Sequence, residues 1–155
     1  MGIGELFYWN NFPYSKDGNL KPRLFILLGK SNIFFPPIVV YLATLTSQIQ
    51  HYESNNYREK NTIVRFKKDE FNLDMESVID LDHDVYDFIL ESEIQNNKDI
   101  KIIDQISNEK LKLIYEKLLL TGISNRYFTI RRNNFCSNRM DCISYIGCSI
   151  RKKMI

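Results

Sequence analysis

Arg23-Leu-Phe-Ile-Leu-Leu28 and Ile38-Val-Val-Tyr-Leu-Ala-Thr-Leu45 are the two stretches of the sequence that decide its fold. Both are almost wholly apolar and have the length of a strand rather than of a helix. Gly29 follows the first stretch and Pro36-Pro37 precede the second, and residues of these types rarely lie inside a helix. The two stretches are therefore predicted to be buried β-strands.

Segments on either side of this pair predict further strands and then one helix. The aromatic segment 5–12 ends at a proline, and 62–66, 78–81 and 86–90 are short runs of strand-forming residues, with a polar loop over 48–60. After Ser107, a predicted N-cap, apolar residues repeat at helical spacing up to Gly122, a predicted stop. Segment 127–130 is a further candidate strand. Several short strands followed by one amphipathic helix predict an α+β fold, a small curved antiparallel barrel with a helix packed on it.

Length and charge divide the chain into a folded body and a basic extension. A chain of 155 residues fits one domain, and 44% hydrophobic with 26% charged residues excludes wholesale disorder. The net charge of +2 hides an asymmetry, because residues 1–120 carry a balance of −4 and residues 121–155 a balance of +6. We therefore expect a domain over 1–120 and a basic, cysteine-containing extension over 121–155, which favours contact with a polyanion or an acidic partner.

The cysteines and apolar runs indicate a protein of the cytoplasm without a metal site. Cys136, Cys142 and Cys148 are odd in number and six residues apart, which does not fit a zinc finger or ribbon. The N-terminus lacks an apolar secretory core, and the longest apolar run, 33–45, contains two prolines and is too short to span a bilayer. We expect no metal, no cofactor, no membrane contact and a cytoplasmic location.

The order of three motifs carries a resemblance to a known family. Gly4-Glu5-Leu6 opens the chain, the Arg23 strand leads to Ile38-Val-Val-Tyr-Leu-Ala-Thr-Leu-Thr-Ser-Gln-Ile-Gln50, and Phe71-Asn-Leu-Asp-Met-Glu-Ser-Val-Ile-Asp-Leu-Asp82 follows. This order, over residues 4 to 119, resembles the PemK/MazF family of toxin endoribonucleases. The resemblance implies an SH3-like barrel that forms a homodimer, binds single-stranded RNA in a groove and is held inactive by a cognate antitoxin protein.

The resemblance also implies a reaction and the residues that perform it. RNA is cleaved without metal, by attack of its own 2′-hydroxyl on the adjacent phosphate. Arg23 takes the position of the family's arginine and Thr46 that of its threonine, both at the scissile phosphate. A guanidinium offers fixed donors and a permanent charge to the phosphate oxygens, and a strand-end hydroxyl adds a further donor. We predict that RNA binding involves four residues of the adjoining loops: Tyr14, Lys16, Lys21 and Ser47.

Other interpretations of these residues stay open at this point. Lys21-Pro22 mimics the family's Arg-Pro pair and would replace Arg23, although Arg23 keeps the spacing to Thr46. Thr46 and Ser47 also suit a turn in which they bond their own backbone. His83, between two aspartates, is either a general base or part of a surface ion pair. Because the family's arginine after the Ser-Val strand is absent, a non-catalytic barrel that binds nucleic acid or protein is the alternative function, and a toxin that poisons a protein target is a third.

Overall fold

The computed structural model describes residues 1–15, 18, 20–31, 36–53 and 62–121, and the fold is mixed α+β with antiparallel strand pairs and short helices. Lys16, the helix stop at Gly122, the candidate strand 127–130, the three cysteines and the extension from 122 onward lie outside the described residues. The strands and helices lie in this order: β1 (Glu5–Trp9), β2 (Arg23–Lys30), β3 (Val39–Leu45), η1 (Ile49–Tyr52), β4 (Ile63–Phe66), η2 (Glu70–Asn72), β5 (Ser77–Asp80), β6 (Val85–Leu90), α1 (Glu91–Ile94), β7 (Ile100–Gln105) and α2 (Asn108–Leu118).

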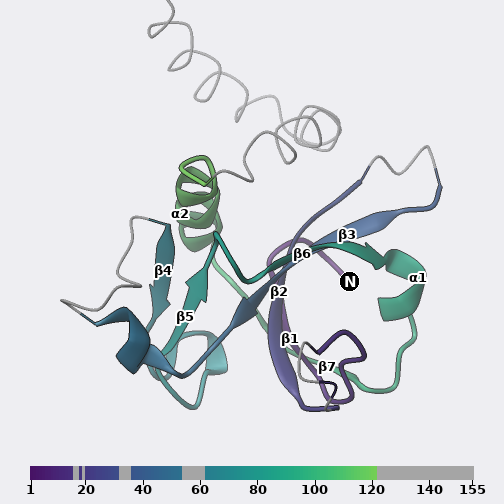
Figure 1. Cartoon of the computed structure of the whole chain (residues 1–155), viewed down its shortest axis with the longest axis horizontal. Coiled ribbons are helices and arrows are strands. Elements are labelled where there is room, and N and C mark those ends of the chain that lie inside the picture. Colours follow the sequence, from purple (N-terminus) through teal and green to yellow (C-terminus); the bar gives the residue numbers. More distant parts are fainter. Residues whose placement is uncertain (16–17, 19, 32–35, 54–61, 122–155) are drawn as a thin grey trace, which may run out of the picture.

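Two antiparallel sheets make up the described part of the molecule (Figure 1). The large sheet has the strand order β6-β3-β2-β1-β7, and the small sheet is the β4–β5 hairpin. An isolated bridge joins them, in which Thr46 and Val78 exchange backbone hydrogen bonds of 2.9 Å in both directions. The large sheet keeps β6 and β7 as edges, so strand pairing among the described residues does not close it into the predicted barrel.

The predicted strands and helix are present, with small shifts at their ends. The two deciding stretches form β2 and β3, the central strands of the large sheet, and β1 ends at Trp9, before the predicted limit. Ser107 caps α2 as predicted, because its hydroxyl accepts a hydrogen bond from the Lys110 amide at 3.2 Å. The strand β7 and the short helices were not predicted, and η1 lies within 48–60, where the sequence predicts a loop.

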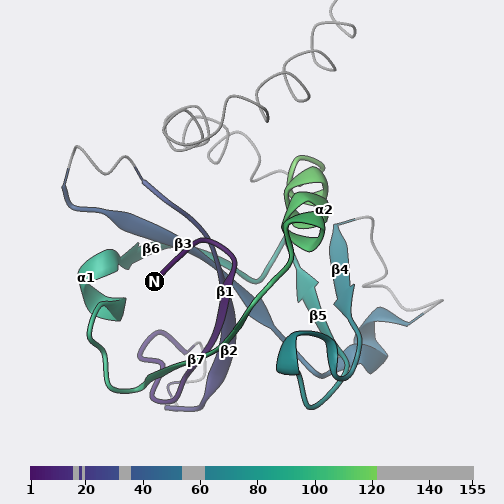
Figure 2. The same cartoon turned by 180° about the vertical axis from the view of Figure 1, so that it is seen from behind.

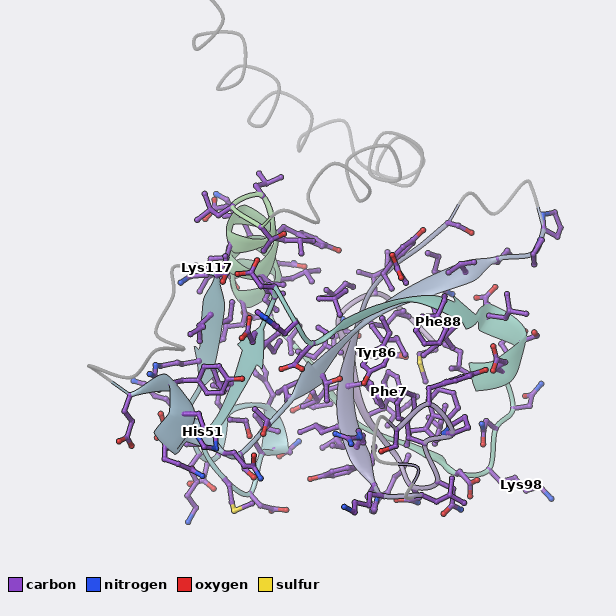
Figure 3. All side chains as sticks on the ribbon, viewed as in Figure 1. Phe7, His51, Tyr86, Phe88, Lys98 and Lys117 are labelled. Atoms are coloured by element: carbon purple, nitrogen blue, oxygen red, sulfur yellow. The ribbon has the colours of Figure 1, made fainter. Side chains whose placement is uncertain are left out.

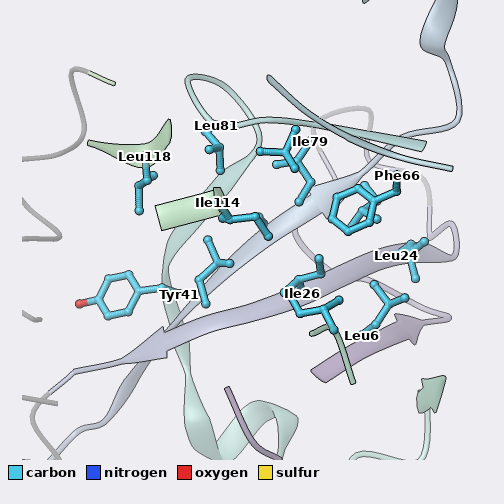
Figure 4. Close-up of a cluster of buried hydrophobic side chains, with 14 of the residues drawn as sticks. Leu6, Leu24, Ile26, Tyr41, Phe66, Ile79, Leu81, Ile114 and Leu118 are labelled. Carbon is cyan, nitrogen blue, oxygen red and sulfur yellow. The ribbon is translucent and has the colours of Figure 1, made fainter. Parts of the chain in front are cut away.

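Each face of the large sheet carries its own hydrophobic cluster. On one face, α2 and the small sheet pack against β1, β2 and β3 (Figure 2), and Figure 4 shows this first cluster with Ile26, Tyr41, Phe66 and Ile114. On the other face, a second cluster consists of residues such as Phe7, Phe12, Phe25 and Leu42. Alternate residues of β2 and β3 enter the two clusters in turn, as expected for strands buried on both faces. This explains why both deciding stretches are apolar without interruption.

Lys110 ties α2 to η2 through an ion pair with Glu70, and to β4 of the small sheet through two further contacts. Lys110 Nζ lies 2.9 Å from Glu70 Oε1, donates to the Arg65 carbonyl and stands over the Phe66 ring. Partial burial alone would raise the pKa of Glu70, but the hydrogen bonds from Lys110 and from the Lys67 amide outweigh it and lower that pKa below 4.5. The ionised carboxylate therefore stabilises the folded state.

Low pH should weaken the ion pair between Glu70 and Lys110. Because the pKa of Glu70 is lower in the folded than in the unfolded chain, its stabilising contribution is complete above pH 4.5 and is lost as the pH falls through the folded pKa. We expect Glu70→Gln to lower Tm near neutral pH, and the difference from wild type to shrink in acid. Glu116→Gln is the matched control, since that exposed carboxylate lies 3.9 Å from Lys112. A difference that stays constant across thermal scans from neutral to acid pH would contradict the expectation.

Candidate active site

A groove of about 440 Å³ lies where the ends of β2 and β3 meet η1 and the segment before β5. The large sheet contributes Arg23 and Thr44 to its lining, and Thr46 and Ser47 follow directly after β3. The lining also includes His51 of η1, which Figure 3 labels, and Ser77 of β5. Both sheets therefore contribute to the groove, which is within the size range of small-ligand sites.

Arg23 and Thr46 come together because of the register between β2 and β3. Leu24 pairs with Leu45 in the antiparallel ladder, and continuing this register by one residue places Arg23 opposite Thr46. Both residues line the groove and both are half-buried. The pair that the sequence predicted as catalytic is therefore brought to one site.

The guanidinium of Arg23 is positioned by the segment after β1. Its Nη2 donates a hydrogen bond of 3.0 Å to Ser15 Oγ, and Trp9 pairs with Arg23 in the β1–β2 ladder. A guanidinium held in this way presents a fixed positive charge to the groove, which suits binding of a phosphate group.

The Thr46 hydroxyl has a defined orientation. Its Oγ1 accepts a hydrogen bond of 3.2 Å from the Gln48 amide, which is the turn interaction that the sequence allowed for it. Since the oxygen accepts from the backbone, its own proton is left to donate elsewhere. The turn interpretation and a donor role in the groove are therefore compatible.

The predicted RNA-binding residues divide between the groove and its surroundings. Ser47 is exposed and lines the groove, whereas Lys21 is exposed but precedes the lining residues Pro22 and Arg23. Tyr14 lies away from the lining, 37% exposed, in ring contact with Phe88. The hydrogen bond that its hydroxyl donates to Glu93, together with burial and the negative charge of Glu93, raises the pKa of Tyr14.

The sequence analysis missed most other residues of the groove, among them Thr44, Asp74 and Asp84. Thr44 is 7% exposed, and its Oγ1 has no hydrogen-bond partner among the described residues. Asp74 and Asp84 place carboxylates in the lining, so the groove is not uniformly cationic. The signal for Thr44 was its position two residues before Thr46 in a strand, which places both side chains on one face.

His83 does not belong to the groove. Its exposed ring lies 3.5 Å from the buried carboxylate of Asp80, a residue other than the two aspartates that flank it in the sequence. In the described ranges, no three His, Cys, Asp or Glu side chains gather in an arrangement that could hold a metal ion. Within the same residues, no helix has the length and apolar character that a bilayer crossing requires.

Comparison with known proteins adds no assignment. No protein-family model matches the chain, and no curated protein matches its sequence.

Proposed function

We propose that this protein is a metal-independent endoribonuclease of the PemK/MazF type, which cleaves single-stranded RNA as the toxin of a type II toxin–antitoxin system. The observation that carries the proposal is the juxtaposition of Arg23 and Thr46 at the ends of paired strands in one groove. Under this proposal, the fold is an opened variant of an SH3-like barrel. Its parts are the large sheet, the small sheet and α2. A homodimer, a cognate antitoxin and a cytoplasmic location belong to the same proposal.

The chemistry needs only groups that RNA and this groove supply. The 2′-oxygen attacks the adjacent phosphorus and gives up its proton to water, and the bond from phosphorus to the 5′-oxygen breaks. The leaving 5′-oxygen takes up a proton from water, so the products are a 2′,3′-cyclic phosphate and a 5′-hydroxyl. Negative charge increases on the phosphate oxygens on the way, and Arg23 and the Thr46 hydroxyl stabilise it by charge and hydrogen bonding. Arg23 does not supply the proton, because its pKa exceeds about 12.

The test is cleavage of single-stranded RNA by the purified full chain in EDTA. We expect fragments with 2′,3′-cyclic phosphate ends, identified by mass spectrometry. RNA with 2′-fluoro sugars should resist, since it lacks the attacking hydroxyl. Intact RNA across substrates of varied sequence would refute the endoribonuclease proposal.

Asp74 and Asp84 favour a second candidate, a module that binds nucleic acid or protein without catalysis. Carboxylates in the same groove as Arg23 weaken its attraction for a transition state that carries extra negative charge. RNA that is bound in EDTA but never cleaved would support this second function. A short acidic protein encoded by the neighbouring reading frame would instead support the toxin.

A further inference from the structure

Thr44 has a buried hydroxyl that no described residue bonds. Only 7% of the residue is exposed, and Oγ1 has no hydrogen-bond partner among the described residues. Its backbone is satisfied, because the Thr44 amide donates to the Asp84 carbonyl at 2.8 Å. A buried polar atom without a partner destabilises a protein, and such atoms are rare in folded domains. Thr44 therefore needs an explanation other than stability.

The position of Thr44 supplies that explanation. It pairs with Phe25 in the β2–β3 register, so it is the diagonal neighbour of Arg23 on the paired strand. Residues two apart on a strand point to the same face, which places Thr44 and Thr46 on one side of β3. All three residues line the groove.

We infer that Thr44 is a phosphate-binding residue, whose hydroxyl donates a hydrogen bond to a non-bridging oxygen of an RNA phosphate held between Arg23 and Thr46. The inference rests on the proposed function for the identity of this ligand. Two hydroxyls and one guanidinium would then face the phosphate from adjacent strands. The Thr44 oxygen itself is buried when no ligand is bound, so its side chain must rotate about χ1 toward the groove for the hydroxyl to reach the phosphate.

Stability provides the first test, with Thr62 as a matched control. Thr62 is also 7% exposed, but its Oγ1 donates to the Asp82 carboxylate at 3.0 Å, and it lies outside the groove lining. Valine keeps the shape of threonine and removes the hydroxyl. We expect Thr62→Val to lower Tm by about 2 to 4 °C, and Thr44→Val to leave Tm unchanged or to raise it. A fall in Tm for Thr44→Val equal to that of Thr62→Val would overturn the inference, since the hydroxyl would then be structural.

Binding provides the second test, with short 2′-fluoro RNA of randomised sequence as the probe. This RNA cannot undergo 2′-hydroxyl attack, so fluorescence anisotropy measures binding alone. We expect Thr44→Val to weaken binding about tenfold, while Thr44→Ser and Thr62→Val bind as the wild type does. Equal binding by Thr44→Val and wild type, or no binding by either, would overturn the inference. If the wild type binds but never cleaves ordinary RNA, the endoribonuclease proposal fails separately, and the binding comparison still decides the role of Thr44.

Discussion

Arg23→Ala should lower the rate of RNA cleavage by about a hundredfold or more. Removing one preorganised donor from a site that stabilises an oxyanion typically has an effect of about 10² to 10³ on turnover. Arg23 provides both donors and charge at the position where the proposed phosphate sits. Because the residue is only half-buried at a strand end, its truncation should leave the fold intact. Steady-state cleavage of labelled RNA in EDTA measures the effect.

Two variants separate a specific role of Arg23 from a general loss of positive charge. Arg23→Lys keeps the charge but lacks the planar fork of donors, so we expect an activity between those of Arg23→Ala and wild type. Lys101→Ala removes a cation from β7, an edge strand outside the groove lining, and should change the rate less than about twofold. Equal losses in Arg23→Ala and Lys101→Ala would show that Arg23 acts only through the overall field.

Phe25→Ala should reduce the free energy of unfolding by about 3 to 5 kcal/mol, the usual range for truncating a buried aromatic residue. Phe25 is fully buried at the centre of the second cluster. Its ring lies 5.7 Å from that of Phe7, 4.8 Å from that of Phe12 and 5.8 Å from that of Tyr86. Alanine leaves a cavity beneath all of them, which urea denaturation followed by tryptophan fluorescence should report.

Phe88→Ala is the control for this cavity. Phe88 contacts the rings of Tyr14 and Tyr86 but is 52% exposed (Figure 3), so we expect its truncation to cost no more than about 1 kcal/mol. Phe25→Leu keeps the variant measurable if alanine unfolds the protein, with an expected loss of about 1 to 2 kcal/mol. A loss in Phe25→Ala no larger than that in Phe88→Ala would show that the second cluster is not a core.

The parts of the fold that could be predicted are those whose residues are buried on two faces or capped locally. Uninterrupted apolar runs marked β2 and β3, and a serine hydroxyl at the right spacing marked the start of α2. Both signals depend on neighbours in the sequence. The α+β class followed from the order of these elements.

The parts that were missed depend on partners far away in the chain. The strand β7 is an edge strand with partly exposed residues, including Ile102 at 52%, so it lacks both a clear apolar run and a clean alternation. It forms by pairing with β1, almost a hundred residues earlier. The open edges of the large sheet likewise follow from long-range pairing, which no local pattern encodes.

The candidate site was predicted only in part, at the residues whose type and spacing indicate a role in binding phosphate. Arg23 and Thr46 were found through spacing and resemblance, and the β2–β3 register places them together. Thr44 was passed over, because a threonine among apolar strand residues resembles an ordinary strand former until its hydroxyl is found without a partner.

The backbone bridge between Thr46 and Val78 limits how far the groove can open, and so affects whether paired or unpaired RNA can bind there. Since these two residues exchange both backbone hydrogen bonds, the two sheets are pinned together beside the groove, and neither wall can move outward without breaking that pair. A space of about 440 Å³ with a fixed closest approach suits one nucleotide unit of a separated strand. The bases of a stem are paired and stacked, so an unpaired strand would place a nucleotide unit there more readily than a stem. Under the proposed function, hairpins in a transcript would therefore protect their own phosphates, and secondary structure of the RNA would select the sites of cleavage alongside base sequence.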